Sequence, residues 1–169
     1  VLIADKDGAV LAEKGFDPIT VKDIVKQRKS ITNYNGGKRI GSEDFWKVPV
    51  DILIPASVTD VINESNKKFI NTKVIVEAGN IPMQESIEEE LFKKGIMFLP
   101  DFVANAGGVI SSYAEYRGYN PKRMFETVRN KIVKTTTLVI KKSLKEKVNP
   151  RKVALELAKK RISEKTKKI

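Results

Sequence analysis

Short apolar runs predict four β-strands along the chain. They lie at 1–4, at 50–56 ("VDILIPA"), at 73–80 ("KVIVEAGN") and at 96–100 ("IMFLP"). The first run ends in the turn sequence Asp-Lys-Asp-Gly, and the third leaves through Gly79. Nearly continuous apolar strands are typical of a parallel sheet that is covered on both faces.

Capped and amphipathic segments between and after these strands predict helices. The predicted helices cover 21–27, 63–70, 84–95, 123–147 and 151–168. The third has leading acids, trailing lysines and Gly95 as a C-terminal cap. Asn149 is a natural N-cap for the last helix, with Pro150 at its first position. Ser42, followed by two acidic residues, signals a further helix start.

The alternation of strands and helices predicts an α/β fold, a Rossmann-like doubly wound parallel sheet with two long C-terminal helices. Such sheets bind ligands beyond the carboxyl ends of their strands. Informative residues follow all four strands: Asp5, Pro55-Ala56-Ser57, Asn80 and Asn105. We therefore expect these four strand ends to face one crevice.

The composition narrows the chemistry that this crevice can perform. The 169 residues include no cysteine and no histidine, which excludes disulfides and thiolate zinc sites and removes the usual general base. We expect neither a metal site nor a catalytic residue in this chain. Because no apolar run is long enough to cross a membrane and no signal peptide is present, a cytoplasmic protein without a membrane partner is expected.

The net charge of +11 is concentrated at the C-terminal end. Residues 134–169 carry 13 Lys or Arg and only 3 Glu. Such a face could meet nucleic-acid phosphates, but lysine-rich helices more often expose their charges to water. Aromatic residues do not interleave the basic ones, so stacking on bases is unsupported and nucleic acid is the weaker expectation.

Asp5 is the first candidate for ligand binding. A carboxylate at the end of a strand can accept hydrogen bonds from both ribose hydroxyls of an adenosine. Its charge would repel a 2′-phosphate and so favours NAD over NADP, a preference that the neighbouring Lys6 softens. The alternative is an ordinary turn aspartate ahead of Gly8.

Asn80 and Asn105 are the second pair of candidates, because each follows a predicted strand within a few residues. Side-chain amides there can both donate to and accept from a ribose or a carboxamide. As isolated asparagines they are more often turn formers.

The segment "PDFVANAGGVISSYAEY" at 100–116 resembles the signature of the glutamate/leucine/phenylalanine/valine dehydrogenase family. The segments "VDILIPAS", "KVIVEAGNIP" and "ELFKKGIMFLPD" follow that family's order and spacing, and "ALELAKKRISE" resembles its closing helix. The resemblance runs from Val1 to about Lys165 and is weakest between 16 and 47.

The resemblance implies the NAD(P)-binding domain of an amino-acid dehydrogenase, usually a homo-hexamer. Such enzymes oxidise glutamate to 2-oxoglutarate and ammonia and pass a hydride to nicotinamide. By position, Asp5 with Lys6 beside it would hold the adenosine ribose. The residues implied for the rest of the dinucleotide are Ala56, Ser57 and Asn80, with Asn105 on the nicotinamide carboxamide. Val109 and Ser112 would meet the substrate side chain, where a serine suits the carboxylate of glutamate.

No Gly-x-Gly-x-x-Gly motif is present, and "GGKRIG" at 36–41 lacks its spacing. The glycine turn of a dinucleotide-binding fold follows its first strand, and the family's catalytic lysine and aspartate lie in a separate N-terminal domain. We therefore expect the C-terminal portion of a longer polypeptide that does not catalyse by itself. Residues 1–120 would form part of the dinucleotide-binding domain, and 121–169 the helices that pack on it.

The sequence departs from the family pattern in three places. Its Glu-Gly-Ala-Asn stands here as Glu-Ala-Gly-Asn at 77–80, its Thr-Thr-Pro-Glu is replaced by Met-Gln-Glu-Ser at 83–86, and Asp60 stands where asparagine is common. The displaced glycine leaves a second hypothesis open, namely a catalytically silent relative that binds NAD as a regulatory subunit. Nucleic-acid binding through the C-terminal helices is the third.

Overall fold

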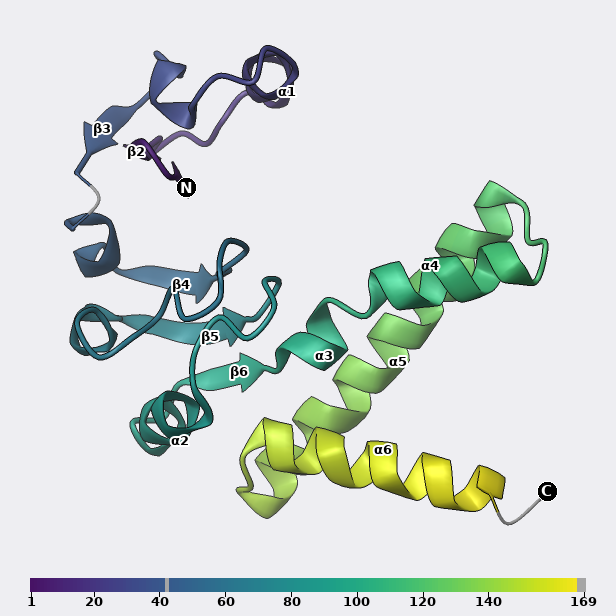
Figure 1. Cartoon of the computed structure of the whole chain (residues 1–169). Coiled ribbons are helices and arrows are strands. Elements are labelled where there is room, and N and C mark those ends of the chain that lie inside the picture. The colour runs from purple at the N-terminus through teal and green to yellow at the C-terminus, as the bar shows by residue number, and fades with distance from the viewer. Residues whose placement is uncertain (42, 167–169) are drawn as a thin grey trace. The chain divides into compact units, whose positions relative to one another are not determined.

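The computed structural model of the chain describes residues 1–41 and 43–166 (Figure 1). These residues divide into two compact units. The N-terminal unit comprises Val1–Pro49 and Lys68–Asn71, and the C-terminal unit comprises Val50–Lys67 and the chain from Thr72 onward.

The N-terminal unit is built on a three-stranded antiparallel sheet, in the order β1-β2-β3. Its strands are β1 (Leu2–Asp5), β2 (Gly8–Leu11) and β3 (Lys38–Ile40). Helix α1 (Pro18–Lys26) begins where the Asp17 carboxylate accepts a hydrogen bond of 2.8 Å from the Thr20 amide. A small apolar core of Val10, Ala12, Ile24, Ile31 and Tyr34 joins the sheet to the helix.

The strand predicted at 1–4 is present, but its predicted place in a parallel sheet is wrong. Strand β1 pairs antiparallel with β2 in a register that sets Asp5 opposite Gly8. The two residues between them, Lys6 and Asp7, form a tight turn that sends the chain straight back along β1. Gly8 has a φ of +143°, which a residue with a side chain rarely adopts.

Two short helices predicted from local signals are reduced to single 3₁₀ turns. Ser42 lies outside the described residues, and the signal there is followed only by the turn η2 (Phe45–Lys47). In the stretch predicted helical at 63–70, only η3 (Lys67–Phe69) is helical. Asparagine side chains hold this stretch in turns instead: the Asn63 amide donates to Asn66 Oδ1 (2.9 Å), and Asn66 Nδ2 donates to the Val61 carbonyl (2.8 Å).

The C-terminal unit holds the parallel sheet that the apolar runs predicted. Its order is β4-β5-β6, and all pairs are parallel. The strands are β4 (Val50–Leu53), β5 (Thr72–Val76) and β6 (Met97–Leu99), and α2 (Glu85–Lys93) connects the last two. Ile75, Met83, Leu91 and Phe98 are buried within this unit. The α/β class is thereby confirmed.

In the part of the chain that the structure describes, four helices follow β6 (Figure 1). They are α3 (Asp101–Ala104), α4 (Gly107–Tyr116), α5 (Pro121–Glu146) and α6 (Pro150–Thr166). The two long C-terminal helices are confirmed, and so is the Asn149 cap, whose Oδ1 accepts from the Arg151 amide at 2.8 Å. A core cluster of Leu99, Val103, Val139, Val153 and Ala154 packs α5 and α6 against β6 and α3. Over 1–41 and 43–166, no helix has the length and apolar character needed to cross a membrane.

Candidate functional site

The loops that follow β4 and β5 touch at the carboxyl edge of the parallel sheet. The Gly79 amide donates to the Pro55 carbonyl at 2.8 Å. A Cβ on Gly79 would lie 3.2 Å from the Ser57 carbonyl oxygen and 3.4 Å from the Pro55 carbonyl oxygen. Because those neighbours are backbone atoms, only glycine allows this approach without shifting a loop.

Two further bonds continue the contact along both loops. Thr59 Oγ1 donates to the Asn80 carbonyl (3.1 Å), and the Asp60 amide donates to the Ile81 carbonyl (3.0 Å). Asp60 and Ile81 both have positive φ angles, +55° and +46°. A β-branched residue in this region is strained, so Ile81 is held there by its hydrogen bonds rather than by its own preference.

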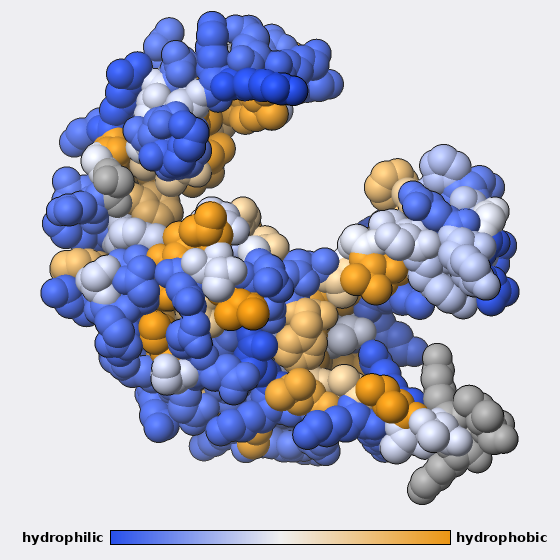
Figure 2. Space-filling model, viewed as in Figure 1, coloured by the Kyte–Doolittle hydropathy of each residue, from blue (hydrophilic) through white to orange (hydrophobic). Residues whose placement is uncertain are grey.

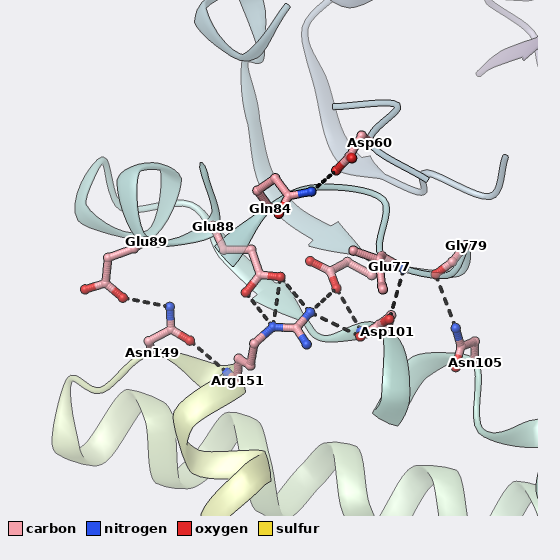
Figure 3. A network of polar contacts seen from close by, with 11 residues as sticks. Asp60, Glu77, Gly79, Gln84, Glu88, Glu89, Asp101, Asn105, Asn149 and Arg151 are labelled. Carbon is pink, nitrogen blue, oxygen red and sulfur yellow. Dashed lines mark hydrogen bonds and ion pairs between the residues drawn. The ribbon is translucent and has the colours of Figure 1, made fainter. Parts of the chain in front are cut away.

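The segment after β6 closes a third side of the same site. Asn105 follows α3, and its side-chain Nδ2 donates to the Gly79 carbonyl at 3.2 Å (Figure 3). Three of the four predicted strand ends therefore meet, at Ala56-Ser57, at Asn80 and at Asn105. The side chains of these four residues are exposed and so can be reached by a ligand.

The surface around these loops is apolar. Ile54 and Val58 follow β4 and are 58% and 70% exposed, and Ile81 is 46% exposed. Figure 2 shows apolar side chains gathered over the carboxyl ends of β4 and β5. An apolar surface with a few carbonyls and side-chain amides is suited to a flat organic ligand.

A buried ion network lies beneath the loops (Figure 3). Its members are Glu77 after β5, Glu88 in α2, Asp101 at the start of α3 and Arg151 in the first turn of α6. Arg151 Nε lies 2.7 Å from Glu88 Oε2, and its Nη2 lies 2.6 Å from Glu88 Oε1. The same Nη2 lies 3.0 Å from Glu77 Oε2 and 3.1 Å from Asp101 Oδ1. One guanidinium thus connects four elements of the unit.

Three carboxylates on one guanidinium leave the network short of positive charge. The three acidic side chains are 0%, 1% and 7% exposed, and Glu77 Oε1 is buried without a hydrogen-bond partner among the described residues. Burial, followed by the charge of Glu88, raises the pKa of Glu77 to about 8. Burial also raises the pKa of Glu88, although Arg151 opposes it. We therefore expect the network to hold a proton at neutral pH.

Asp5 lies in the N-terminal unit, where the protein's own donors occupy its carboxylate. Its Oδ2 accepts from the Ile31 amide (2.7 Å), and its Oδ1 accepts from the Asp7 amide (2.9 Å) and from Ser30 Oγ (3.0 Å). Slight burial raises the pKa of Asp5, but these bonds and the Lys6 charge outweigh it, so the net shift is downward. The Asp5 carboxylate is therefore ionised at neutral pH.

Lys6 lies in the tight turn beside Asp5. It pairs with Asp7 at 3.0 Å and lines a hollow of about 390 Å³ together with Thr32 and Arg39. The expected ribose roles of Asp5 and Lys6 stay predictions.

Val109 and Ser112 both lie on α4. Val109 is 78% exposed, and the Ser112 hydroxyl donates to the Gly108 carbonyl at 3.1 Å, within its own helix. Their expected contact with a substrate stays a prediction.

The ion network was not anticipated from the sequence, although two signals for it were present. Glu77 ends a run of apolar strand residues, and Glu88 lies beside Ile87 on the apolar side of its helix. An acidic residue at a position that the pattern marks as buried requires a partner. The partner, Arg151, is 63 residues away from Glu88, so the sequence alone does not identify it.

Comparison with known proteins shows the family of the chain. The sequence matches the Glutamate/Leucine/Phenylalanine/Valine dehydrogenase family over residues 1–168. The chain belongs to that family. It is similar to a glutamate dehydrogenase of Aeropyrum pernix, with 34% identity over 158 residues, which are 88% of this chain and 38% of that protein. It is also similar to an NADP-specific glutamate dehydrogenase of Saccharolobus shibatae, with 38% identity over 68% of this chain and 27% of that protein.

Among solved structures, the hetero-hexameric glutamate dehydrogenase of Thermus thermophilus covers 97% of the chain, with a TM-score of 0.80 and 20% identity. That likeness shows the fold, and the Rossmann-like class is confirmed. The match takes in 40% of the Thermus chain. The present chain thus spans well under half the length of the relatives that it matches.

Proposed function

We propose that this chain is the nucleotide-binding part of an NAD(P)-dependent glutamate dehydrogenase, which converts L-glutamate to 2-oxoglutarate and ammonia. The observation that carries the proposal is the contact between the loops at 55–60 and 79–81, with Asn105 bonded to Gly79. This arrangement presents exposed amides on an apolar surface at the carboxyl edge of a parallel sheet, where dinucleotides bind. The chain's family and the names of its relatives support this choice of reaction.

In this proposal Ala56, Ser57 and Asn80 line the dinucleotide, and Asn105 binds the nicotinamide carboxamide. One N–H of the Asn105 side chain donates to the Gly79 carbonyl. The side-chain oxygen can then accept from the NH₂ group of a carboxamide, and the second N–H can donate to its oxygen. The bound nicotinamide supplies the hydride acceptor, and the protein's part is to orient it.

The remaining assignments extend the same proposal. Asp5 and Lys6 hold the adenosine ribose, and Val109 and Ser112 face the glutamate side chain. Residues 1–120 belong to the dinucleotide-binding domain, and 121–169 are helices that pack on it. The intact enzyme is a cytoplasmic homo-hexamer. The charge of Asp5 favours NAD, whereas one relative is NADP-specific. Activity should therefore be measured with both cofactors.

The first test is substrate competition with the full-length protein. Initial rates with glutamate, leucine and phenylalanine are compared, each with NAD⁺ and with NADP⁺. We expect glutamate to give the highest kcat/KM. A higher value for leucine would contradict the role of Ser112. Binding of NADH without turnover of any amino acid would favour the catalytically silent relative.

The second test addresses the assigned site directly. Asn105→Ala removes the carboxamide partner, and we expect the KM for the dinucleotide to rise about tenfold. Asn130→Ala, on the exposed side of α5, is the matched control and should leave KM unchanged. Equal KM values for the two variants would remove Asn105 from the site.

A further inference from the structure

We propose that Arg151 is a positioning residue that acts through Asp101 on the dinucleotide loop at 79–81, so that the start of α6 sets dinucleotide affinity. The inference rests on the proposed function, because it assigns that loop to a dinucleotide. Neither residue contacts the loop's ligand-facing side chains, and the effect passes through the backbone.

The Asp101 carboxylate links Arg151 to the loop, because each of its two oxygens accepts a hydrogen bond from one of them. Asp101 Oδ1 accepts from Arg151 Nη2 at 3.1 Å (Figure 3). Asp101 Oδ2 accepts from the Ile81 amide at 3.0 Å. The Asp101 side chain is 7% exposed, so water competes little for either bond. A shift of the guanidinium therefore turns the carboxylate and moves the acceptor away from the loop.

The Arg151 guanidinium is itself held in place by Glu88. Its Nε and Nη2 donate to both oxygens of Glu88, in the bidentate geometry that best fixes an arginine plane. Glu77 Oε2 accepts from the same Nη2 (3.0 Å) and from the Asp101 amide (2.8 Å). Asp101 is thus oriented both through its side chain and through its backbone.

The loop needs this support because its conformation is strained. Ile81 has a φ of +46°, which a β-branched residue does not adopt unaided. If its amide lost the Asp101 acceptor, the residue would relax toward an extended conformation. That movement would carry along the Asn80 carbonyl, which Thr59 binds, and the Gly79 carbonyl, which Asn105 binds.

The number of carboxylates in the network also indicates that it positions the loop at 79–81, and does not only hold α6 against α2. The Glu88–Arg151 pair would suffice to hold α6 against α2, and a second and third buried carboxylate add desolvation cost without further neutralisation. Both extra carboxylates, Glu77 and Asp101, lie on the path to the loop. Their placement is explained if the network holds the loop as well as the helix.

The decisive variant is Asp101→Asn in the full-length protein. An asparagine keeps the size of the side chain but has only one acceptor oxygen. Because Arg151 and the Ile81 amide donate to opposite oxygens of the Asp101 carboxylate, the asparagine oxygen can face only one of them, and its NH₂ group faces the other donor. The matched control is Glu89→Gln. Glu89 Oε2 accepts from Asn149 and Lys152 and so also anchors the start of α6, but no bond from it leads to the loop in the described part of the chain.

We expect Asp101→Asn to raise the Kd for NADH and NADPH, measured by fluorescence titration, about tenfold or more, and Glu89→Gln to leave it unchanged. Faster hydrogen exchange of the Ile81 amide in Asp101→Asn alone would accompany the loss. A folded Asp101→Asn protein with the wild-type Kd and wild-type exchange would overturn the proposal. If wild-type protein bound no dinucleotide, the proposed function would fail, and the exchange comparison would still decide the positioning role.

A second variant keeps the proposal testable if the Asp101→Asn protein does not fold. Arg151→Lys keeps the positive charge but loses the planar fork that holds Glu88 and reaches Asp101 together. We expect a raised Kd and faster Ile81 exchange in this variant too. Wild-type values for both would overturn the proposal.

Discussion

Arg151 and Glu88 face each other as a bidentate ion pair, with 2.6 Å between Nη2 and Oε1 and 2.7 Å between Nε and Oε2. The pair joins the first turn of α6 to α2, across 63 residues of sequence. The arginine is 13% exposed and the glutamate 1%, so the pair lies almost entirely away from water. The stability of the unit therefore depends on keeping the pair intact.

Replacing Arg151 by methionine should destabilise the C-terminal unit strongly. The substitution preserves most of the side-chain volume but leaves three buried carboxylates without a cation, which typically costs about 3–5 kcal/mol. Urea unfolding gives the free energy. Lys142→Met is the control, because Lys142 pairs with the exposed Glu156 at 2.7 Å, and such surface pairs contribute about 1 kcal/mol or less. Equal losses for the two variants would contradict the buried network.

Glu77 should make stability fall as the pH rises. Its pKa is raised from the usual 4.5 to about 8 by burial and by Glu88, so above about pH 4.5 the folded state retains a proton that the unfolded state releases. Stability is then complete below pH 4.5, declines up to about pH 8, and is constant above it, with a total loss on the order of 5 kcal/mol. Three other charged groups face Glu77, namely Asp101, Arg151 and Glu88. The pKa of Glu88 is also raised, so its titration lowers stability with rising pH as well.

Glu77→Gln tests this prediction, because glutamine stays neutral at every pH. Urea midpoints at about pH 6 and about pH 8.5 should differ less in the variant than in the wild type. Parallel pH profiles would show that Glu77 is ionised in the folded protein. Glu89→Gln serves as the control, since a bond from Lys152 lowers the pKa of Glu89 and its removal should not flatten this decline.

Gly79→Ala should separate the two loops of the candidate site. The added Cβ would lie 3.2 Å from the Ser57 carbonyl, and relieving such crowding costs about 1–3 kcal/mol. We expect a lower thermal midpoint and a raised KM for the dinucleotide. Gly108→Ala is the stability control: a Cβ there meets nothing within 4 Å, and alanine should stabilise α4 by about 0.5–1 kcal/mol. Unchanged KM in Gly79→Ala would place the dinucleotide elsewhere.

Asp5→Ala should affect both folding and binding. The Asp5 carboxylate accepts three hydrogen bonds inside the N-terminal unit, so its loss should destabilise that unit by about 1 kcal/mol. Because the pKa of Asp5 is lowered, its contribution is present above its usual pKa and is lost as the pH falls through the lowered value. The dinucleotide Kd should also rise about tenfold if Asp5 holds the ribose. Asp23→Ala, on the exposed side of α1, should change neither quantity.

Local pattern was sufficient to predict most elements of the C-terminal unit. The apolar runs at 50–56, 73–80 and 96–100 correspond to β4, β5 and β6. Helix α5 begins and ends within two residues of the prediction, and α6 begins within one residue of it; the predicted end of α6 at 168 lies outside the described residues. These features follow from short-range rules: apolar residues at strand spacing, and Asn149 with Pro150 at a helix start. The motif at 100–116 also indicated the family correctly.

Only the tertiary structure decided which distant groups meet. Strand β1 pairs locally with β2 rather than with the parallel sheet, because a two-residue turn closes that hairpin. Gly79 is a point of close backbone approach, since the Ser57 carbonyl lies against it. The sequence by itself determined the elements and the family, because these depend on neighbouring residues. The partnership of Arg151 with Glu77, Glu88 and Asp101 depends on packing that joins residues 50 or more positions apart, and no local pattern encodes it.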